Sequence, residues 1–156
     1  MILYHFTSRA NLDSIMAHGL NRGEAPLSDT RVLQAVNLTS DSSPHGHGLD
    51  GGGDIVTAAQ SARYLRDFGW VIPAGTVIAD KREVRLTVKI RSSDPKLKRW
   101  LPWAMRHCEP GYPERLANAA GGMAKAETWW LYFGTVLPSA ISSIDDLQKE
   151  SSVSGE

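Results

Sequence analysis

The order of its segments predicts an α+β fold for this 156-residue chain, because strand-like and helix-like patterns do not alternate regularly along it. Residues 83–90 alternate strictly between polar and apolar side chains, which is typical of a half-buried strand. Residues 58–68 instead repeat their apolar side chains at helical spacing. A glycine-rich stretch over 40–54 precedes both segments and predicts a long surface loop.

The remaining elements are predicted from shorter patterns. The chain opens with a strand over 3–8, and a helix follows that Gly19 can close in a left-handed conformation. Further strands are predicted at 36–39, 128–133 and 141–144, further helices at 97–107 and 111–120, and a strand or turn fragment at 70–78. Pro102 is expected to break or kink the helix at 97–107.

Composition limits the class of protein. Hydrophobic residues make up 42% of the chain and charged residues 22%, so a single domain over 1–149 with a frayed tail at 150–156 is expected. The formal net charge of zero gives no global attraction for nucleic acid, although a local basic patch stays possible. The single cysteine, Cys108, excludes an internal disulfide. Without a signal pattern or a long apolar run, a cytoplasmic protein without membrane contact is expected.

Three segments together resemble the ADP-ribosyltransferase superfamily. The first is Leu3-Tyr4-His5-Phe6-Thr7-Ser8 followed by Asn11-Leu12-x-Ser14-Ile15-x-x-x-Gly19-Leu20, the second is Ala35–Asp41, and the third is Glu127–Ile141. They cover about half of the chain. The resemblance implies split antiparallel β-sheets with flanking helices. It also implies an NAD-dependent enzyme that moves ADP-ribose to a macromolecular acceptor and releases nicotinamide.

The resemblance assigns Glu127 and His5 as catalytic residues. Transfer passes through a cation-like ribose, and a carboxylate beside it stabilises that charge. Glu127 precedes an apolar strand and is expected to project from the strand end into a cleft with apolar walls. His5 is expected to hydrogen-bond the ribose hydroxyls, since neutral imidazole offers one donor and one acceptor. The alternatives are a solvated Glu127 and a His5 that is satisfied by neighbouring backbone.

The resemblance also implies a set of NAD contacts, which comprises His5, Phe6, Thr7, Arg9, Thr39, Ser40 and Tyr64. Thr39 and Ser40 occupy the second-strand position, Tyr64 is a platform for nicotinamide, and Arg9 is placed to meet the pyrophosphate. The second strand carries no tyrosine, so the match to the His-Tyr-Glu branch is incomplete. The alternative for the Thr39 and Ser40 hydroxyls is a cap of the strand end or a turn through Asp41. For the aromatic side chains the alternative is core packing, and for Arg9 it is a solvated position. Lys125 stands where arginine-modifying members carry glutamate or glutamine, which argues against arginine as the acceptor.

The sequence also allows other interpretations of the loop histidines and of the function. His45 and His47 with Asp50 and Asp54 have the residue types of a metal site, but the loop offers no second histidine pair, and no metal is expected. The chain is small enough to suggest a toxin, phage or defence enzyme by analogy, with a protein or nucleic-acid acceptor. The alternatives are an RNA 2′-phosphotransferase, or a non-catalytic relative that binds NAD, ADP-ribose or a protein. Exposed tryptophans would serve the last of these: Trp100, Trp103, Trp129 and Trp130.

Overall fold

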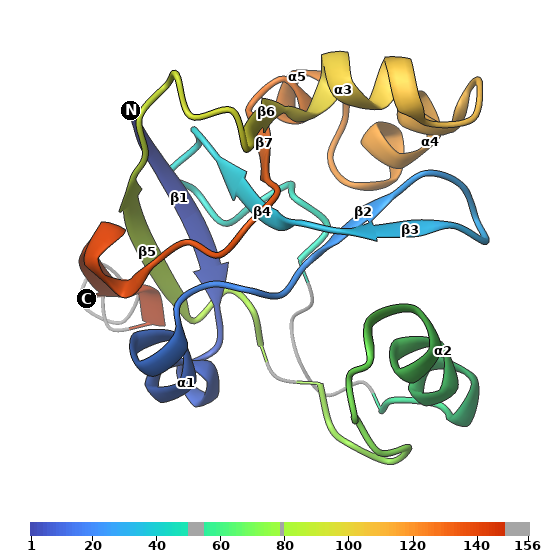
Figure 1. Cartoon of the computed structure of the whole chain (residues 1–156), viewed down its shortest axis with the longest axis horizontal. Helices are drawn as coiled ribbons and strands as arrows, with labels where there is room; N and C mark the ends of the chain where they lie inside the picture. The colour runs from blue at the N-terminus through green and yellow to red at the C-terminus, as the bar shows by residue number, and fades with distance from the viewer. Residues whose placement is uncertain (50–54, 79, 149–156) are drawn as a thin grey trace.

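A computed structural model describes residues 1–49, 55–78 and 80–148 and confirms the α+β class (Figure 1). A six-stranded antiparallel sheet has the order β6-β7-β4-β1-β5-β8, and β2 and β3 form a separate hairpin. The strands are β1 Ile2–Thr7, β2 Glu24–Pro26, β3 Val32–Gln34, β4 Val36–Thr39, β5 Val84–Lys89, β6 Leu97–Arg99, β7 Trp129–Tyr132 and β8 Ile141–Asp146. The helices are α1 Leu12–His18, α2 Ala58–Phe68, α3 Trp100–His107, α4 Tyr112–Ala119 and α5 Met123–Ala126, with 3₁₀ turns at Arg9–Asn11 and Pro138–Ala140.

The large sheet consists of two three-stranded halves. β1 pairs with β5 along its whole length, and β4 pairs in the same way with β7. Between β1 and β4, the described residues share a single register pair, Tyr4 with Thr39. We call this junction the seam. Because few backbone hydrogen bonds cross it, side chains can take over the contact between the halves.

Two clusters of apolar side chains form the core. The first lies on one face of the sheet and includes Leu3, Leu86 and Val88, all 0% exposed. Burying each such side chain contributes about 1.5–3 kcal/mol. The second cluster joins β7 to the three helices α3, α4 and α5, which gather at one end of the molecule (Figure 1). Trp100 belongs to this second cluster and is buried, so the expectation that it is exposed is wrong.

Several predicted boundaries need correction. The segment 97–107 begins as strand β6 and turns helical only at Trp100. Pro102 is the third residue of α3, where a backbone N–H has no partner within the helix, so it is tolerated without a break. The described part of 70–78 contains no strand; Val77 makes only an isolated bridge with Ile55. The β2–β3 hairpin and helix α5 were not predicted.

The predicted helix at 58–68 is correct at both ends. Thr57 caps it, since the Thr57 hydroxyl accepts from the Gln60 N–H and the Gln60 side chain accepts from the Thr57 N–H. Gly69 ends it in the left-handed region at φ 70°. None of the described helices is long and apolar enough to cross a membrane.

Candidate functional site

Three neighbouring strands bring the segments of the predicted site together. β1 carries His5, β4 ends at Thr39, and β7 begins just after Glu127, and the three lie in the order β7-β4-β1. The Ser40 N–H donates to the Thr128 carbonyl at 2.9 Å, which extends the β4–β7 contact to the residue next to Glu127. The Thr128 hydroxyl donates its proton to the Lys125 carbonyl at 2.6 Å. In the contact between the two hydroxyls, at 2.9 Å, Thr39 is therefore the donor and the Thr128 oxygen is the acceptor.

His5 crosses the seam with its side chain. Its Nδ1–H donates to the Asn37 carbonyl of β4 at 2.8 Å, so in the neutral ring Nε2 is an acceptor. Burial lowers the pKa of His5, the hydrogen bond to Asn37 partly offsets this, and the Lys81 charge lowers the pKa further. Within the described part of the chain, Nε2 has no hydrogen bond. Backbone therefore satisfies one nitrogen of His5, while the other can accept from a ligand hydroxyl.

The register places His5 and Thr39 on opposite faces of the sheet. Thr39 is opposite Tyr4, and His5 is opposite Leu86 on the face that carries the first core cluster. Partners directly opposite each other share a face, and successive residues alternate. The predicted pair of His5 and Thr39 thus lies close in the sheet but does not converge on one side of it.

On the Thr39 face, four polar side chains interlock; we call Asp41, His47, Lys125 and Trp129 the His47 cluster. The Trp129 indole N–H donates to His47 Nδ1 at 2.9 Å. On the other side of the ring, Nε2 lies 3.0 Å from the Ser43 carbonyl and 3.2 Å from Asp41 Oδ2. Lys125 Nζ contacts the same Asp41 oxygen at 2.5 Å. These bonds hold the loop after β4 against the sheet and α5.

The hydrogen bonds fix which nitrogen of His47 carries the proton. An indole nitrogen is a donor only, so Nδ1 must be unprotonated and the proton sits on Nε2. Burial lowers the pKa of His47, while the Asp41 carboxylate opposes that shift. The pKa of Asp41 is lowered in turn: burial raises it, but the hydrogen bonds from Lys125 and the Ser43 N–H outweigh that effect. His47 is therefore neutral beside an ionised Asp41.

The loop after β4 folds by short-range side-chain bonds. The Asp41 N–H donates to the Thr39 hydroxyl at 3.0 Å, and the Ser43 N–H donates to Asp41 Oδ1 at 3.0 Å. These two-residue steps are turns that threonine and aspartate favour. Gly46 then reaches the α4–α5 turn, where a Cβ on Gly121 would lie only 2.1 Å from the Gly46 carbonyl oxygen. The described part of the loop is thus a packed segment.

Glu127 differs from its expected setting. It is the C-terminal cap of α5, at φ −65° and ψ −18°, and its side chain is exposed. The expected strand end in a cleft with apolar walls is therefore wrong, because the four-residue helix α5 ends there and turns the residue outward. Among the described residues, no group forms a hydrogen bond or ion pair with the Glu127 carboxylate. The carboxylate is available to a ligand.

The other predicted NAD contacts are dispersed. Ser40 is exposed beside Thr128. Phe6 is 7% exposed and stacks on the His47 ring at a centroid distance of 6.0 Å. Thr7 is 4% exposed and accepts from the Asn11 side chain.

Arg9 and Tyr64 lie away from the seam. Arg9 pairs with Glu83 at 2.8 Å and Asp146 at 3.2 Å and also contacts Gln148, so its charge is already compensated. Tyr64 lies on α2 with its ring 6.0 Å from that of Trp70. Neither residue is in a position to complete the site described above.

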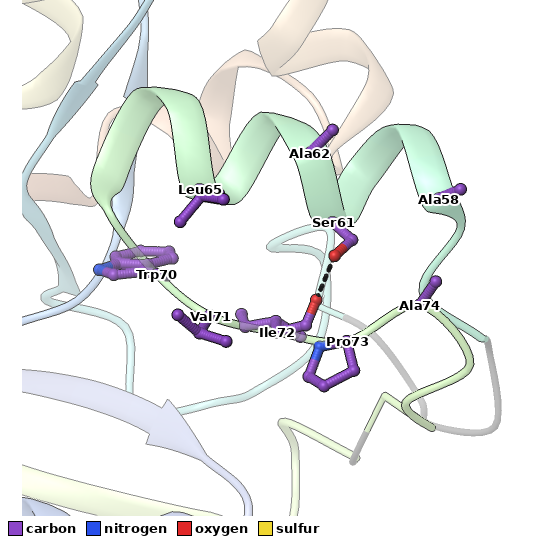
Figure 2. Close-up of a pocket in the computed structure, with 9 residues that line it drawn as sticks. All are labelled: Ala58, Ser61, Ala62, Leu65, Trp70, Val71, Ile72, Pro73 and Ala74. Carbon is purple, nitrogen blue, oxygen red and sulfur yellow. Dashed lines mark hydrogen bonds between the residues drawn. The ribbon is translucent and has the colours of Figure 1, made fainter.

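A pocket of about 280 Å³ lies between α2 and residues 70–74 (Figure 2). Apolar side chains such as Leu65, Trp70 and Ile72 line it, and the Ser61 hydroxyl donates to the Ile72 carbonyl at 2.6 Å. Neither His5 nor Glu127 lines this pocket. It is therefore separate from the seam.

The histidines of the loop show no metal centre in the described residues. No group of three or more side chains of the metal-binding types gathers there. Asp50 and Asp54, which completed the metal interpretation of His45 and His47, lie outside the described residues. The sequence signal for the His47 cluster was the run of hydroxyl and carboxyl side chains after β4, which predicts turns, but it did not indicate the distant partners Lys125 and Trp129.

The chain was compared with protein-family models, with curated proteins and with solved structures, and none of them matches it. The fold and the site are those of an α+β protein with a six-stranded antiparallel sheet, a neutral histidine at the seam and an exposed carboxylate close to the end of β4.

Proposed function

We propose that the protein is an NAD-dependent ADP-ribosyltransferase. The observation that carries the proposal is the order β7-β4-β1, which makes direct neighbours of the strand with His5, the strand that ends in Thr39 and the segment with Glu127. The segments with Thr39 and Glu127 follow His5 by about 30 and about 120 residues in sequence. The resemblance requires these three segments to be adjacent in space.

In the proposed reaction, the bond between the ribose C1 and the nicotinamide nitrogen breaks, and its electron pair leaves with nicotinamide. The acceptor nucleophile forms a new bond to C1 and gives up its proton. Glu127 supplies negative charge for the cation-like transition state and takes that proton. The His5 Nε2 accepts from a ribose hydroxyl and orients the sugar, and the lowered pKa keeps this nitrogen unprotonated.

The described contacts narrow the residues assigned to NAD. Ser40 and Glu127 are exposed and His5 is half-buried with an unbonded Nε2; these three residues, on or next to the neighbouring strands β7, β4 and β1, form the proposed contact set. Phe6 and Thr39 do not contact NAD in this proposal: Phe6 stacks on His47, and Thr39 hydrogen-bonds Thr128. They are positioning residues in the proposal.

The test uses purified protein and NAD labelled separately in nicotinamide and in adenine. Wild type is expected to release nicotinamide and to transfer the adenine label to an acceptor in a lysate. Glu127→Gln is expected to lower release by about 10²-fold or more, since it removes the charge that stabilises the transition state. The control is Glu109→Gln, which changes another exposed glutamate and should leave release unchanged. Equal release by wild type and Glu127→Gln would remove Glu127 from the mechanism.

One observation favours a second candidate, a non-catalytic relative that binds NAD or ADP-ribose. Glu127 is exposed to water, where a carboxylate stabilises a cation far less than in a water-excluded site. Binding of NAD without nicotinamide release, with or without lysate, would favour this candidate over the transferase.

A further inference from the structure

Helix α3 has two unlike faces. Trp100 and Ala104 are buried in the second core cluster. A neighbouring face carries Arg99, Pro102, Trp103, Arg106 and His107, which follow one another at spacings of three, one, three and one residue and so share one stripe of the helix. These five residues and Lys98 of β6 line a pocket of about 240 Å³.

The cations of this pocket are not neutralised. Lys98, Arg99 and Arg106 are exposed, and within the described ranges no carboxylate lies within salt-bridge distance of them. Several arginines elsewhere differ in this respect: Arg9, Arg63 and Arg115 each pair with an acidic side chain. The chain has 17 basic and 17 acidic residues, so this patch is a local excess of positive charge on a neutral molecule.

An aromatic ring lies among these cations. Trp103 is half-buried, with its ring 5.5 Å from Phe133 on the core side and 5.2 Å from the His107 ring along the helix. The Phe133 ring packs against the indole and helps to fix its position. The pocket thus combines a supported indole with cations on both of its flanks.

We propose that this pocket, the α3 groove, binds a single-stranded nucleic acid. Backbone phosphates would contact Lys98, Arg99 and Arg106, and a base would stack on Trp103; cations that follow a backbone together with an aromatic platform are how single strands are held. An acidic peptide would use the cations but leave the indole without a stacking partner. The proposal is independent of the NAD chemistry, because the groove contains neither His5 nor Glu127.

Fluorescence anisotropy of a labelled oligo(dT) of about 15 nucleotides tests the proposal directly. Wild type is expected to bind, with affinity that falls as salt rises by a log–log slope near −2, about −0.7 for each of three phosphates. Arg99→Ala/Arg106→Ala should weaken binding by about tenfold or more and reduce the slope to about −0.7. Both side chains are exposed, so this variant should fold.

The matched control is Arg31→Ala/Arg66→Ala, which removes two exposed arginines outside the groove and changes the net charge equally. It should bind as wild type does.

Trp103→Ala should lose about fivefold or more in affinity at unchanged salt slope, with circular dichroism as the check that it folds. The proposal is overturned by absence of binding, by equal losses in the groove and control variants, or by equally tight competition from polyglutamate, which would indicate an acidic-protein surface. None of these results depends on nicotinamide release.

Discussion

At the scale of single residues, the site is defined by two neutral histidines with opposite uses of their ring nitrogens. His5 donates through Nδ1 and leaves Nε2 free, whereas His47 accepts at Nδ1 from Trp129 and uses Nε2 toward Ser43 and Asp41. Protonation of His47 would set an Nδ1–H against the indole N–H. The neutral ring is therefore a condition for the packing of the loop after β4.

The requirement for a neutral His47 ring predicts that the stability of the fold depends on pH. Because the folded-state pKa of His47 is lowered, the unfolded chain binds the proton more readily, and the free energy of unfolding falls as pH drops below about 6.5. Each such histidine contributes a slope of at most about 1.4 kcal/mol per pH unit. Urea unfolding between pH 7.5 and 5.5 should show this fall in wild type and a flatter profile in His47→Gln.

The control for that measurement is His18→Gln, which replaces an exposed histidine at the end of α1. Its pH profile should follow wild type. His47→Gln should also cost about 1–3 kcal/mol at pH 7.5, since it disturbs the partner of a part-buried indole N–H. A His47→Gln profile as steep as that of wild type would show that the ring is not the group that titrates.

At the scale of elements, the sequence predicts those segments whose pattern is local and leaves out those held by distant partners. The helix at 58–68 carries its own cap in Thr57 and Gln60, and the strand around Leu86 alternates over its whole length. Helix α5 has only four residues, and the β2–β3 hairpin has three-residue strands with little alternation. Such short elements form because tertiary packing stabilises them, which no local pattern reports.

The candidate site follows the same rule. The strands that carry His5 and Thr39 were predicted from their local patterns, but the setting of Glu127 depends on the unpredicted helix α5. Arg9 was assigned to a phosphate because it begins a helix, yet its acidic partners come from β5 and β8, far along the chain. Ion pairs of this kind cannot be inferred from spacing.

The contact between the loop after β4 and the α4–α5 turn can be tested with two adjacent glycines. Gly121 and Gly122 have φ values of 117° and 102°, a range that L side chains rarely adopt, so alanine at either costs about 1–3 kcal/mol in backbone strain. At Gly121 the added Cβ would also lie 2.1 Å from the Gly46 carbonyl oxygen, whereas at Gly122 it meets nothing within 4 Å. Thermal unfolding should therefore show a larger loss for Gly121→Ala, and equal losses would contradict the packed loop.

At the scale of the whole molecule, the seam makes His5 a structural link as well as a proposed ligand contact. It joins two halves of the sheet that, within the described residues, share one register pair between β1 and β4. A change at His5 therefore affects both stability and NAD binding unless the two roles are separated.

His5→Asn separates them, because the asparagine amide can donate to the Asn37 carbonyl as Nδ1 does but offers no acceptor in the place of Nε2. We expect its melting temperature to stay near that of wild type while its affinity for NAD falls by about two- to tenfold, the worth of one hydrogen bond. His5→Ala should lose both. Calorimetry of NAD binding beside thermal unfolding measures the two effects, and wild-type affinity in His5→Asn would leave His5 with the structural role alone.

The division of the sheet also sets an order for assembly. The half formed by β4, β6 and β7 is complete once residue 132 has been synthesised, whereas the half with β1 and β5 waits for β8, which ends at Asp146. Contacts between such distant segments are slow to form, because a long stretch of chain must close first. On the ribosome, the amino-terminal strand β1 therefore has both of its partners, β4 and β5, once residue 89 has been made, and each half is closed only later, by β7 and by β8.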